Sequence, residues 1–328
     1  MKACGSCKRN QSKKGKTVSE ETVSIPSAGL RLSGVVHLPQ GVDRHERRAS
    51  FLVLHGFGSN KDSQNLLRPC KLLNELGYAT LRFDMRGCGE SEGERGRVIC
   101  LEQVEDTRNA LTFLAGHPAV EPGRIGAIGS SFGGAVAVYA GGTDERIAAV
   151  ISNGGWGDGE RKFRGQHATP EAWTRFTAML AAGRAHRERT GRSLMVPRYD
   201  IVPIPAHVRD NLAQRDVQMF PPGTIEMFPA ETAQSMFEFR ADDVVGKIAP
   251  RPLLLLHSAT DSVTPTEQSV EMFKRAGQPA ELHLFSGVDH FMFAEDNSRV
   301  WGVVRDWLEN YFPAQAIHPR GRNRGPAG

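Results

Sequence analysis

The stretch RIGAIGSSFGGAVAVYAG, residues 124–141, sets an apolar segment, a serine and a glycine-rich segment in direct succession. Ser131 lies at the centre of a Gly-x-Ser-x-Gly spacing. A sharp turn that carries a reactive serine tolerates only small neighbours, which Gly129 and Gly133 provide. A helix that begins at such a turn favours developing negative charge at its N-terminus. The stretch therefore predicts a strand, a tight turn with Ser131 and a helix.

The same spacing recurs around Ser91 in GCGESEG, so spacing alone does not choose between the two serines. Ser91 lies between Glu90 and Glu92, whose carboxylates would oppose a developing oxyanion, and the next helical pattern begins several residues later. Ser130 occupies the x position of the spacing around Ser131. These surroundings favour Ser131 as the nucleophile.

The segments on either side of this turn alternate between strand and helix patterns. Apolar and polar residues alternate around Ala28 and Gly29, which predicts an antiparallel hairpin. Further strands are predicted in ASFLVLHGFGS, ATLRFDMRG, RIGAIG, IAAVISNGG, RPLLLLHS and AELHLFSG, most of them separated by helical spacing. Strands that alternate with helices predict the α/β class, with a doubly wound, mostly parallel sheet and helices on both faces.

One region breaks this alternation. Residues 156–243 contain no convincing strand and hold helical patterns such as PEAWTRFTAMLAAGRAHRER and AETAQSMFEFR, separated by proline-rich segments. An insertion of this length between two strands predicts a helical cap over one end of the sheet. The core is then formed by 20–155 and 244–312, with disordered tails at 1–19 and 313–328.

The net charge of +4 arises at the two ends of the chain. Residues 1–19 hold six Lys or Arg, residues 313–328 hold three Arg, and neither segment has an acidic residue, so removing these nine charges leaves −5. Solvated ends account for this pattern, and we expect no nucleic-acid partner. No apolar run approaches the roughly 18 residues of a membrane helix, so we expect no membrane partner either.

The cysteines favour a cytoplasmic protein with free thiols. Their number is odd, they lie in the first third of the chain, and no apolar stretch near the N-terminus is typical of a signal peptide. Cys4 and Cys7 have C-x-x-C spacing, but a structural zinc site needs four ligands and no second Cys or His pair is nearby. We therefore expect no metal site.

A nucleophilic serine needs a base, and the base needs a carboxylate that orients it. His290 lies in the loop between the last strand and the last helix, whereas His283 lies within a strand and His318 in the tail. Asp261 follows a buried strand and can reach that loop. Asp289 is the rival acid, but adjacent side chains on an extended loop diverge. The pattern predicts Ser131, His290 and Asp261 as the catalytic residues.

The order Ser, Asp, His is that of the α/β-hydrolases, and the sequence resembles this superfamily over residues 25–155 and 243–312. LVLHGFGSNKDS resembles the oxyanion loop, and RFDMRGCGESEG resembles the segment D-x-R-G-x-G-x-S-x-G. That second resemblance assigns Ser91 to a structural loop. Within the superfamily, the sequence is similar to capped bacterial esterases of the cinnamoyl-esterase type and to hydrolases related to Xaa-Pro dipeptidyl peptidases.

The resemblance implies the remaining site residues. The backbone N–H groups of Phe57 and Phe132 would hold the oxyanion. APRPLLLLHSATDSVTP resembles the acid loop H-G-x-x-D-x-x-V-P, from which it departs by Ser258 in place of glycine and by one residue fewer between Asp261 and Val263. No cofactor is implied.

These observations predict a serine hydrolase that cleaves a carboxylic ester of a small to medium, apolar or aromatic substrate. Trp156, Phe176 and Phe237 in the cap are the expected substrate-binding residues, although helical spacing also suits them to the core of the cap. The substrate is a small molecule, and a homodimer is left open.

The same triad serves other reactions, and the sequence does not rank them. An amidase or peptidase, a thioesterase, a C–C bond hydrolase and an acyltransferase all remain alternatives, as does a non-catalytic ligand-binding protein on a hydrolase fold. A peptidase needs acidic residues for the substrate's amine. Cap residues of that kind are Glu160, Glu171, Glu226 and Glu231, which also suit a solvated helix surface.

Overall fold

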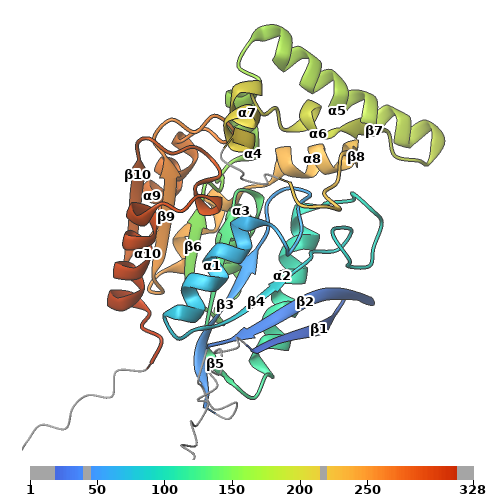
Figure 1. The fold of residues 1–328 in the computed structure, drawn as a ribbon. Coiled ribbons are helices and arrows are strands. Elements are labelled where there is room, and N and C mark those ends of the chain that lie inside the picture. Colours follow the sequence, from blue (N-terminus) through green and yellow to red (C-terminus); the bar gives the residue numbers. More distant parts are fainter. Residues whose placement is uncertain (1–18, 40–45, 215–219, 316–328) are drawn as a thin grey trace, which may run out of the picture.

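The computed structural model describes residues 19–39, 46–214 and 220–315. Eight strands form one sheet in the order β1-β2-β4-β3-β5-β6-β9-β10 (Figure 1). The strands are β1 (Ser19–Ser27), β2 (Leu30–Leu38), β3 (Arg48–Leu54), β4 (Ala79–Phe83), β5 (Val120–Ser130), β6 (Ile147–Asn153), β9 (Leu253–Ser258) and β10 (Ala280–Phe285). β1 and β2 pair antiparallel, β2 is antiparallel to β4, and the remaining pairs are parallel. The predicted mostly parallel α/β sheet is confirmed.

The first two strands form the predicted hairpin. The turn consists of Ala28 and Gly29, both with positive φ (48° and 81°), which is the backbone geometry that a two-residue hairpin turn requires. β1 begins at Ser19, so the sheet starts one residue inside the segment that we expected to be a tail. The rest of the two predicted tails, 1–18 and 316–328, lies outside the described residues, whereas 313–315 are described.

Helices cover both faces of the sheet. On one face, α1 (Gln64–Glu75) and α10 (Ser298–Tyr311) pack over side chains such as Phe51 and Val53 of β3. On the other face, α2 (Cys100–Ala115), α3 (Phe132–Thr143) and α9 (Glu267–Arg275) contribute to a second core that contains Leu52 and Leu54 of the same strand. Because successive side chains of a strand point to opposite faces, both sets are buried, and the strand is a continuous apolar run.

Residues between β6 and β9 form the insertion that stands above the sheet in Figure 1. We call residues 156–243 the cap. Its helices are α4 (Gly159–Gln166), α5 (Pro170–Thr190), α6 (Arg198–Ile201), α7 (Ala206–Gln214) and α8 (Ala230–Glu238). It also contains the antiparallel pair β7 (Met195–Pro197) and β8 (Met227–Pro229), and the chain returns to the core through the short helices η1 (Ala241–Asp243) and η2 (Val245–Ile248).

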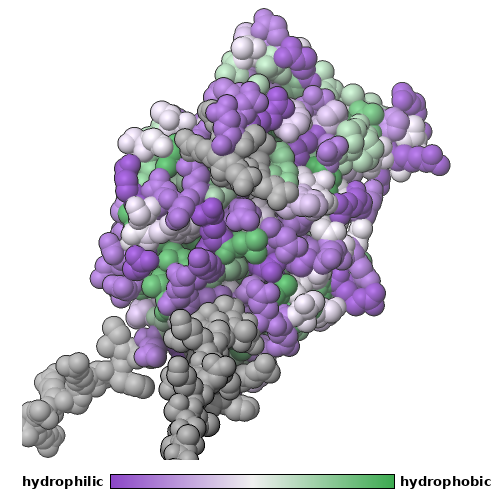
Figure 2. All heavy atoms as spheres, in the orientation of Figure 1, coloured by the Kyte–Doolittle hydropathy of each residue, from purple (hydrophilic) through white to green (hydrophobic). Residues whose placement is uncertain are grey.

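The expectation that the cap contains no strand was wrong. β7 and β8 have three residues each, which is too short for a period-two pattern to be visible, and 29 residues separate the end of β7 from the start of β8. In the view of Figure 1, most of the described surface is hydrophilic and is interrupted by smaller apolar areas (Figure 2). No helix in the described part of the chain has the length and apolar character needed to cross a membrane.

The cap is tied to the core by hydrogen bonds near the start of α2. Ser235 of α8 accepts a hydrogen bond from the backbone N–H of Cys100 at 2.9 Å, and Thr232 accepts one from the N–H of Val98 at 3.1 Å. The residue that precedes α2, Ile99, has no side-chain oxygen and makes no capping bond of its own. The cap therefore satisfies backbone donors that a helix N-terminus normally leaves to a local side chain.

This arrangement predicts that Ser235→Ala lowers the free energy of unfolding by about 1 kcal/mol, because the buried N–H of Cys100 loses its acceptor. Chemical denaturation measures the change. Ser286→Ala is the matched control, since Ser286 lies exposed after β10, and it should change the free energy of unfolding by less than about 0.5 kcal/mol. Equal effects of the two substitutions would contradict the capping role.

Candidate active site

Ser131 occupies a strained turn between β5 and α3, which confirms the predicted strand, turn and helix. Its φ of 57° and ψ of −116° lie in a region that residues with a side chain rarely adopt. The N–H of Ser131 donates to the carbonyl of Asn153 at the end of β6, at 2.7 Å. A Cβ at Gly129 would collide with the Gly133 carbonyl, and one at Gly133 would collide with the Leu54 carbonyl. Only glycines at these two positions allow the turn to close.

His290 and Asp261 form a buried pair on two loops of the same sheet edge. Nδ1 of His290 donates to Oδ2 of Asp261 at 2.8 Å, and both side chains are almost entirely buried. The other carboxylate oxygen, Oδ1, accepts from the backbone N–H groups of Val263 and Thr264 at 2.8 and 2.7 Å. The carboxylate thus keeps the ring proton on Nδ1 and leaves Nε2 without one. In this tautomer, Nε2 can accept a proton from a serine.

A second histidine contacts the same carboxylate. Nε2 of His257 lies 3.3 Å from Oδ2 of Asp261 and donates to the carbonyl of Thr264 at 3.0 Å, while Ser269 donates to its Nδ1. Burial by itself raises the pKa of Asp261, but the charge of His290 and the hydrogen bonds from both histidines outweigh it. The pKa of Asp261 therefore lies well below its ordinary value, and the carboxyl stays ionised.

Asp289, the rival acid, has different partners. Its Oδ1 accepts from the backbone N–H of Ser262 at 2.9 Å and from that of His290 at 2.7 Å, and its Oδ2 accepts from the Ser262 hydroxyl. The side chain thus joins the acid loop to the histidine loop. Ser258, which departs from the family pattern, does the same by donating to the carbonyl of Val288 at 2.8 Å.

Ser131 and His290 line one narrow pocket, which also contains Phe57. Phe132 follows Ser131 directly at the start of α3. In the described part of the chain, the backbone N–H groups of Phe57 and Phe132 have no hydrogen-bond acceptor. Two amides without partners beside a serine turn are the arrangement that an oxyanion hole requires.

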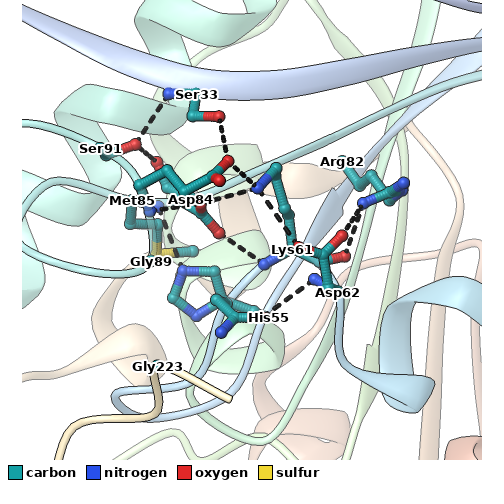
Figure 3. Close-up of polar contacts among 12 residues, drawn as sticks. Ser33, His55, Lys61, Asp62, Arg82, Asp84, Met85, Gly89, Ser91 and Gly223 are labelled. Carbon is teal, nitrogen blue, oxygen red and sulfur yellow. Dashed lines mark hydrogen bonds and ion pairs between the residues drawn. The ribbon is translucent and has the colours of Figure 1, made fainter. Parts of the chain in front are cut away.

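A polar network holds the loop that carries Phe57 (Figure 3). His55 accepts from the N–H of Met85 at 3.1 Å and donates from Nδ1 to the carbonyl of Gly56 at 2.8 Å. Burial lowers the pKa of His55, so the ring is neutral and can accept a hydrogen bond at Nε2 while it donates one from Nδ1. Asp84 accepts from the backbone N–H of Lys61 at 2.5 Å and from its Nζ at 3.3 Å.

Ser91 belongs to this network. Its hydroxyl donates to the carbonyl of Asp84 at 2.5 Å and accepts from the N–H of Ser33 at 2.9 Å (Figure 3). It joins the loop after β4 to β2 and does not line the pocket of Ser131. Sequence reasoning assigned Ser91 to a structural loop but did not identify the network around Asp84 and Lys61.

The expected substrate-binding residues lie elsewhere. Trp156, Phe176 and Phe237 are not among the residues that line this pocket, and their role in substrate binding stays a prediction. Trp156 packs against Phe132 and Phe239, whereas Phe176 stacks on Phe163 and contacts Phe237. Aromatic residues at helical spacing are commonly buried, and the spacing of these three indicates burial within the protein rather than a place at the pocket. None of Glu160, Glu171, Glu226 and Glu231 lines the pocket either.

The pocket walls come from residues that the sequence analysis missed. Val202, Ile204 and Phe220 of the cap, with Val263 and Phe291 of the core, provide apolar surface, and Arg198 is the charged residue among the cap residues of the lining. Gly154 is a further missed residue. It has a φ of 60°, and a Cβ there would lie 3.2 Å from the His290 ring. The signal for Gly154 is its position directly after β6.

The sequence matches one protein family and is similar to several curated proteins. A family model described as serine aminopeptidase, S33 matches residues 45–297, which is more than half of the chain. An uncharacterized 31.7 kDa protein of Escherichia coli is 26% identical over 87% of this chain and 97% of its own length. The polyketide transferase GrgF of a Penicillium species is 26% identical over 75% of this chain and 82% of its own length.

Solved structures share the fold. The structure of the α/β hydrolase GrgF superimposes with a TM-score of 0.72 at 24% identity, covering 89% of this chain and 99% of GrgF. Est1E of Butyrivibrio proteoclasticus with ferulic acid bound gives a TM-score of 0.61 at 19% identity, covering 88% and 98%. Further similar proteins are described as esterases, a monoacylglycerol lipase and a thiohydrolase.

The depressed pKa of Asp261 predicts how Asp261→Asn changes stability with pH. The ionised carboxyl stabilises the fold fully above pH of about 5, and this contribution is lost as the pH falls below the ordinary value of about 3.9 towards the pKa in the folded state. Asparagine does not titrate. The difference in free energy of unfolding between wild type and variant should therefore shrink between pH of about 6 and about 3 in urea titrations. A constant difference across this range would show that Asp261 does not carry the linkage.

Proposed function

Because this chain belongs to the α/β-hydrolase family described as serine aminopeptidase, S33, and is a serine hydrolase by that membership, we propose that it is a carboxylesterase. It cleaves esters of small to medium, largely apolar acids through an acyl-enzyme on Ser131. The observation that carries the proposal is the buried pair of His290 and Asp261, at 2.8 Å, beside the strained turn of Ser131. No cofactor takes part in this reaction.

The reaction follows from the partners of each side chain. Oγ of Ser131 bonds to the ester carbonyl carbon while its proton passes to Nε2 of His290. The C–O bond to the alcohol then breaks, and His290 returns the proton to the departing oxygen. Asp261 stabilises the imidazolium through the bond to Nδ1. A water molecule, deprotonated by His290, then bonds to the acyl carbon. The C–O bond to Ser131 breaks, and His290 returns the proton to Oγ as the acid leaves.

The oxyanion of each tetrahedral intermediate is held by the N–H groups of Phe57 and Phe132. Both amides lack an acceptor in the described residues, so no internal bond must break before they bind the oxygen. The network of His55, Asp84 and Lys61 keeps the Phe57 amide in place during turnover. Preorganised donors of this kind are typically worth about 3 kcal/mol each in the transition state.

The apolar walls of the pocket support a largely apolar acyl group. Phe220 and Ile204 approach from the cap, and Val263 and Phe291 approach from the core. An aminopeptidase, by contrast, needs an anionic group for the substrate's ammonium. The charged cap residue at this pocket is Arg198, a cation, so the pocket favours an ester over a peptide with a free amine.

Thioester cleavage or acyl transfer is the second candidate. Relatives are described as a thiohydrolase and as polyketide transferases, at 25–34% identity. The acyl-enzyme is common to all these reactions, which differ in the leaving group and in whether water or another alcohol accepts the acyl group.

The proposal places the protein in the cytoplasm with a small-molecule substrate. Cys70, Cys88 and Cys100 are free and buried, and burial raises the pKa of each thiol to about 12. Such thiols are unreactive at neutral pH. The C-x-x-C pair of Cys4 and Cys7 lies outside the described residues. That the protein forms a homodimer stays a prediction, which a measurement of its oligomeric state in solution would test.

A fluorophosphonate tests the proposed nucleophile. We expect one adduct on wild-type protein by intact-mass analysis, no adduct on Ser131→Ala, and a loss of kcat of at least about a thousandfold in that variant, because the attacking oxygen is gone. Ser286→Ala is the matched control, since Ser286 lies exposed after β10 and does not line the pocket, and it should label like wild type. Labelling of Ser131→Ala, or its absence in Ser286→Ala, would contradict the assignment.

The leaving group is tested with matched esters, thioesters and amides of one acid, assayed with wild type and Ser131→Ala. We expect kcat/KM for the p-nitrophenyl ester to exceed that for the p-nitroanilide by at least about a hundredfold. A thioester preferred over the ester would make the second candidate the function. Turnover that persists in Ser131→Ala would contradict both.

Gly154→Ala tests the position of the base. The new Cβ meets the His290 ring at 3.2 Å and the backbone holds a φ of 60°, so the imidazole must shift. We expect kcat/KM for a p-nitrophenyl ester to fall about 10- to 100-fold. Gly302→Ala in α10, where a Cβ meets nothing within 4 Å, is the control and should keep full activity. Full activity in Gly154→Ala would show that His290 needs no fixed position.

A further inference from the structure

Arg198 is a buried cation at the pocket of Ser131. It is the first residue of α6, directly after β7, and only 5% of its surface is exposed. Nη1 donates to the carbonyl of Phe57 at 2.8 Å, Nη2 to that of Gly58 at 3.1 Å, and Nε to that of Ile225 at 2.9 Å. These bonds hold the guanidinium between the oxyanion loop and the cap.

In the described part of the chain, the groups that contact the guanidinium are uncharged, and the exposed Glu226 acts on it only through its charge. No Asp or Glu of the described residues lies within ion-pair distance of Arg198. Instead, the rings of Phe220, Phe57 and Phe228 surround it, with centroids 4.6, 5.2 and 5.4 Å from its central carbon. Burial lowers the pKa of Arg198 to about 10, so it keeps its charge at neutral pH.

Two of its donors have no acceptor in residues 19–39, 46–214 and 220–315. A guanidinium carries five N–H groups, and three of them bond to the carbonyls of Phe57, Gly58 and Ile225. The other two have no acceptor among the described residues. Buried charges are normally paired, because an unpaired charge removed from water raises the free energy of the protein. An anion that enters the pocket would supply the missing acceptors.

The guanidinium is also held in a fixed position. Gly58 has a φ of 54°, and a Cβ there would lie 2.8 Å from Nη2 of Arg198 and would collide with the Phe228 ring. Phe228 in turn stacks on Phe57 with a centroid distance of 4.3 Å. A cation packed this closely does not have to be ordered when a ligand arrives, which favours binding of a planar, two-oxygen group.

Arg198, Ser131 and His290 line the same pocket, whose other cap residues are the apolar Val202, Ile204 and Phe220. We propose that Arg198 binds a carboxylate of the ester substrate, so that the enzyme prefers half-esters, which carry one ester and one free carboxylate. The inference rests on the proposed function, since it names the substrate class of that site. The carboxylate belongs to the acyl chain or to the alcohol, and the assay separates these two sources.

The assay compares each charged ester with its neutral monoamide. Monomethyl glutarate and monomethyl adipate place the carboxylate on the acyl side, and the O-acetyl ester of 4-hydroxybutanoate places it on the alcohol side. For one of the two sides, we expect wild-type kcat/KM for the carboxylate to exceed that for the amide by about 10- to 100-fold, because charge-assisted bonds are lost in the amide. In Arg198→Met the ratio should fall to about one.

The ratio of kcat/KM for the carboxylate to kcat/KM for the amide is measured within one protein. A general loss of activity caused by the substitution therefore cancels. Arg198→Met also removes a donor from the carbonyls of Phe57, Gly58 and Ile225, which lowers activity on charged and neutral esters alike. Arg209→Met is the matched control. Arg209 lies exposed in α7 over the ring of Tyr199, and its loss should leave the ratio unchanged. A wild-type ratio near one on both sides, or an unchanged ratio in Arg198→Met, would overturn the inference.

A binding measurement provides a test that depends neither on turnover nor on whether the Arg198→Met variant folds. Calorimetry on Ser131→Ala uses both kinds of ester, monomethyl glutarate and the O-acetyl ester of 4-hydroxybutanoate, each against its monoamide. For one of the two, the carboxylate should bind with at least about tenfold higher affinity than the amide, and added salt should reduce the difference. If wild type turns over neither ester but Ser131→Ala prefers the carboxylate, the proposed function fails and the anion site stands. Equal affinities for carboxylate and amide in both pairs would overturn the anion site, whatever the turnover.

Discussion

The close approach of three backbones at Ser131 is the constraint on which the site depends. The end of β5, the start of α3 and the end of β3 meet where Gly129 and Gly133 leave no room for a side chain. This contact forces Ser131 into its strained conformation and brings the loop of Phe57 beside it. The proposed nucleophile and the proposed oxyanion donors are therefore positioned by one packing contact rather than by two independent loops.

Carboxylates fix the remaining loops by accepting backbone N–H groups. Asp84 holds the loop between β3 and α1 through the N–H of Lys61. Asp261 holds its own loop through Val263 and Thr264, and Asp289 joins that loop to His290. Each of these side chains follows a strand at the same edge of the sheet. The imidazole is positioned because the acid loop and the histidine loop are bonded to each other and to Ser258.

Local patterns predicted the parts of this structure that neighbours in sequence determine. The turn of Ser131 could be read from its glycines, and the hairpin from Ala28 and Gly29, because each depends on a few consecutive residues. The pocket lining could not, because Arg198 meets Phe57 across 141 positions of sequence. Aromatic spacing identified Trp156 and Phe176 as buried, yet spacing contains no information on which cavity a buried ring faces.

The bonds between cap and core bear on how this fold diversifies. α2 belongs to the core, yet its first N–H is satisfied by Ser235 of the cap. In the loop that carries Phe57, the carbonyl of Gly58 accepts hydrogen bonds from the backbone N–H of Ile225 and from Arg198, both of the cap. Removal of residues 156–243 would take away the present acceptors of the N–H groups of Val98 and Cys100 and the present donors to the Gly58 carbonyl. The cap of this chain is therefore part of the folding of its scaffold as well as the wall of its pocket, and any segment put in its place has to supply equivalent partners.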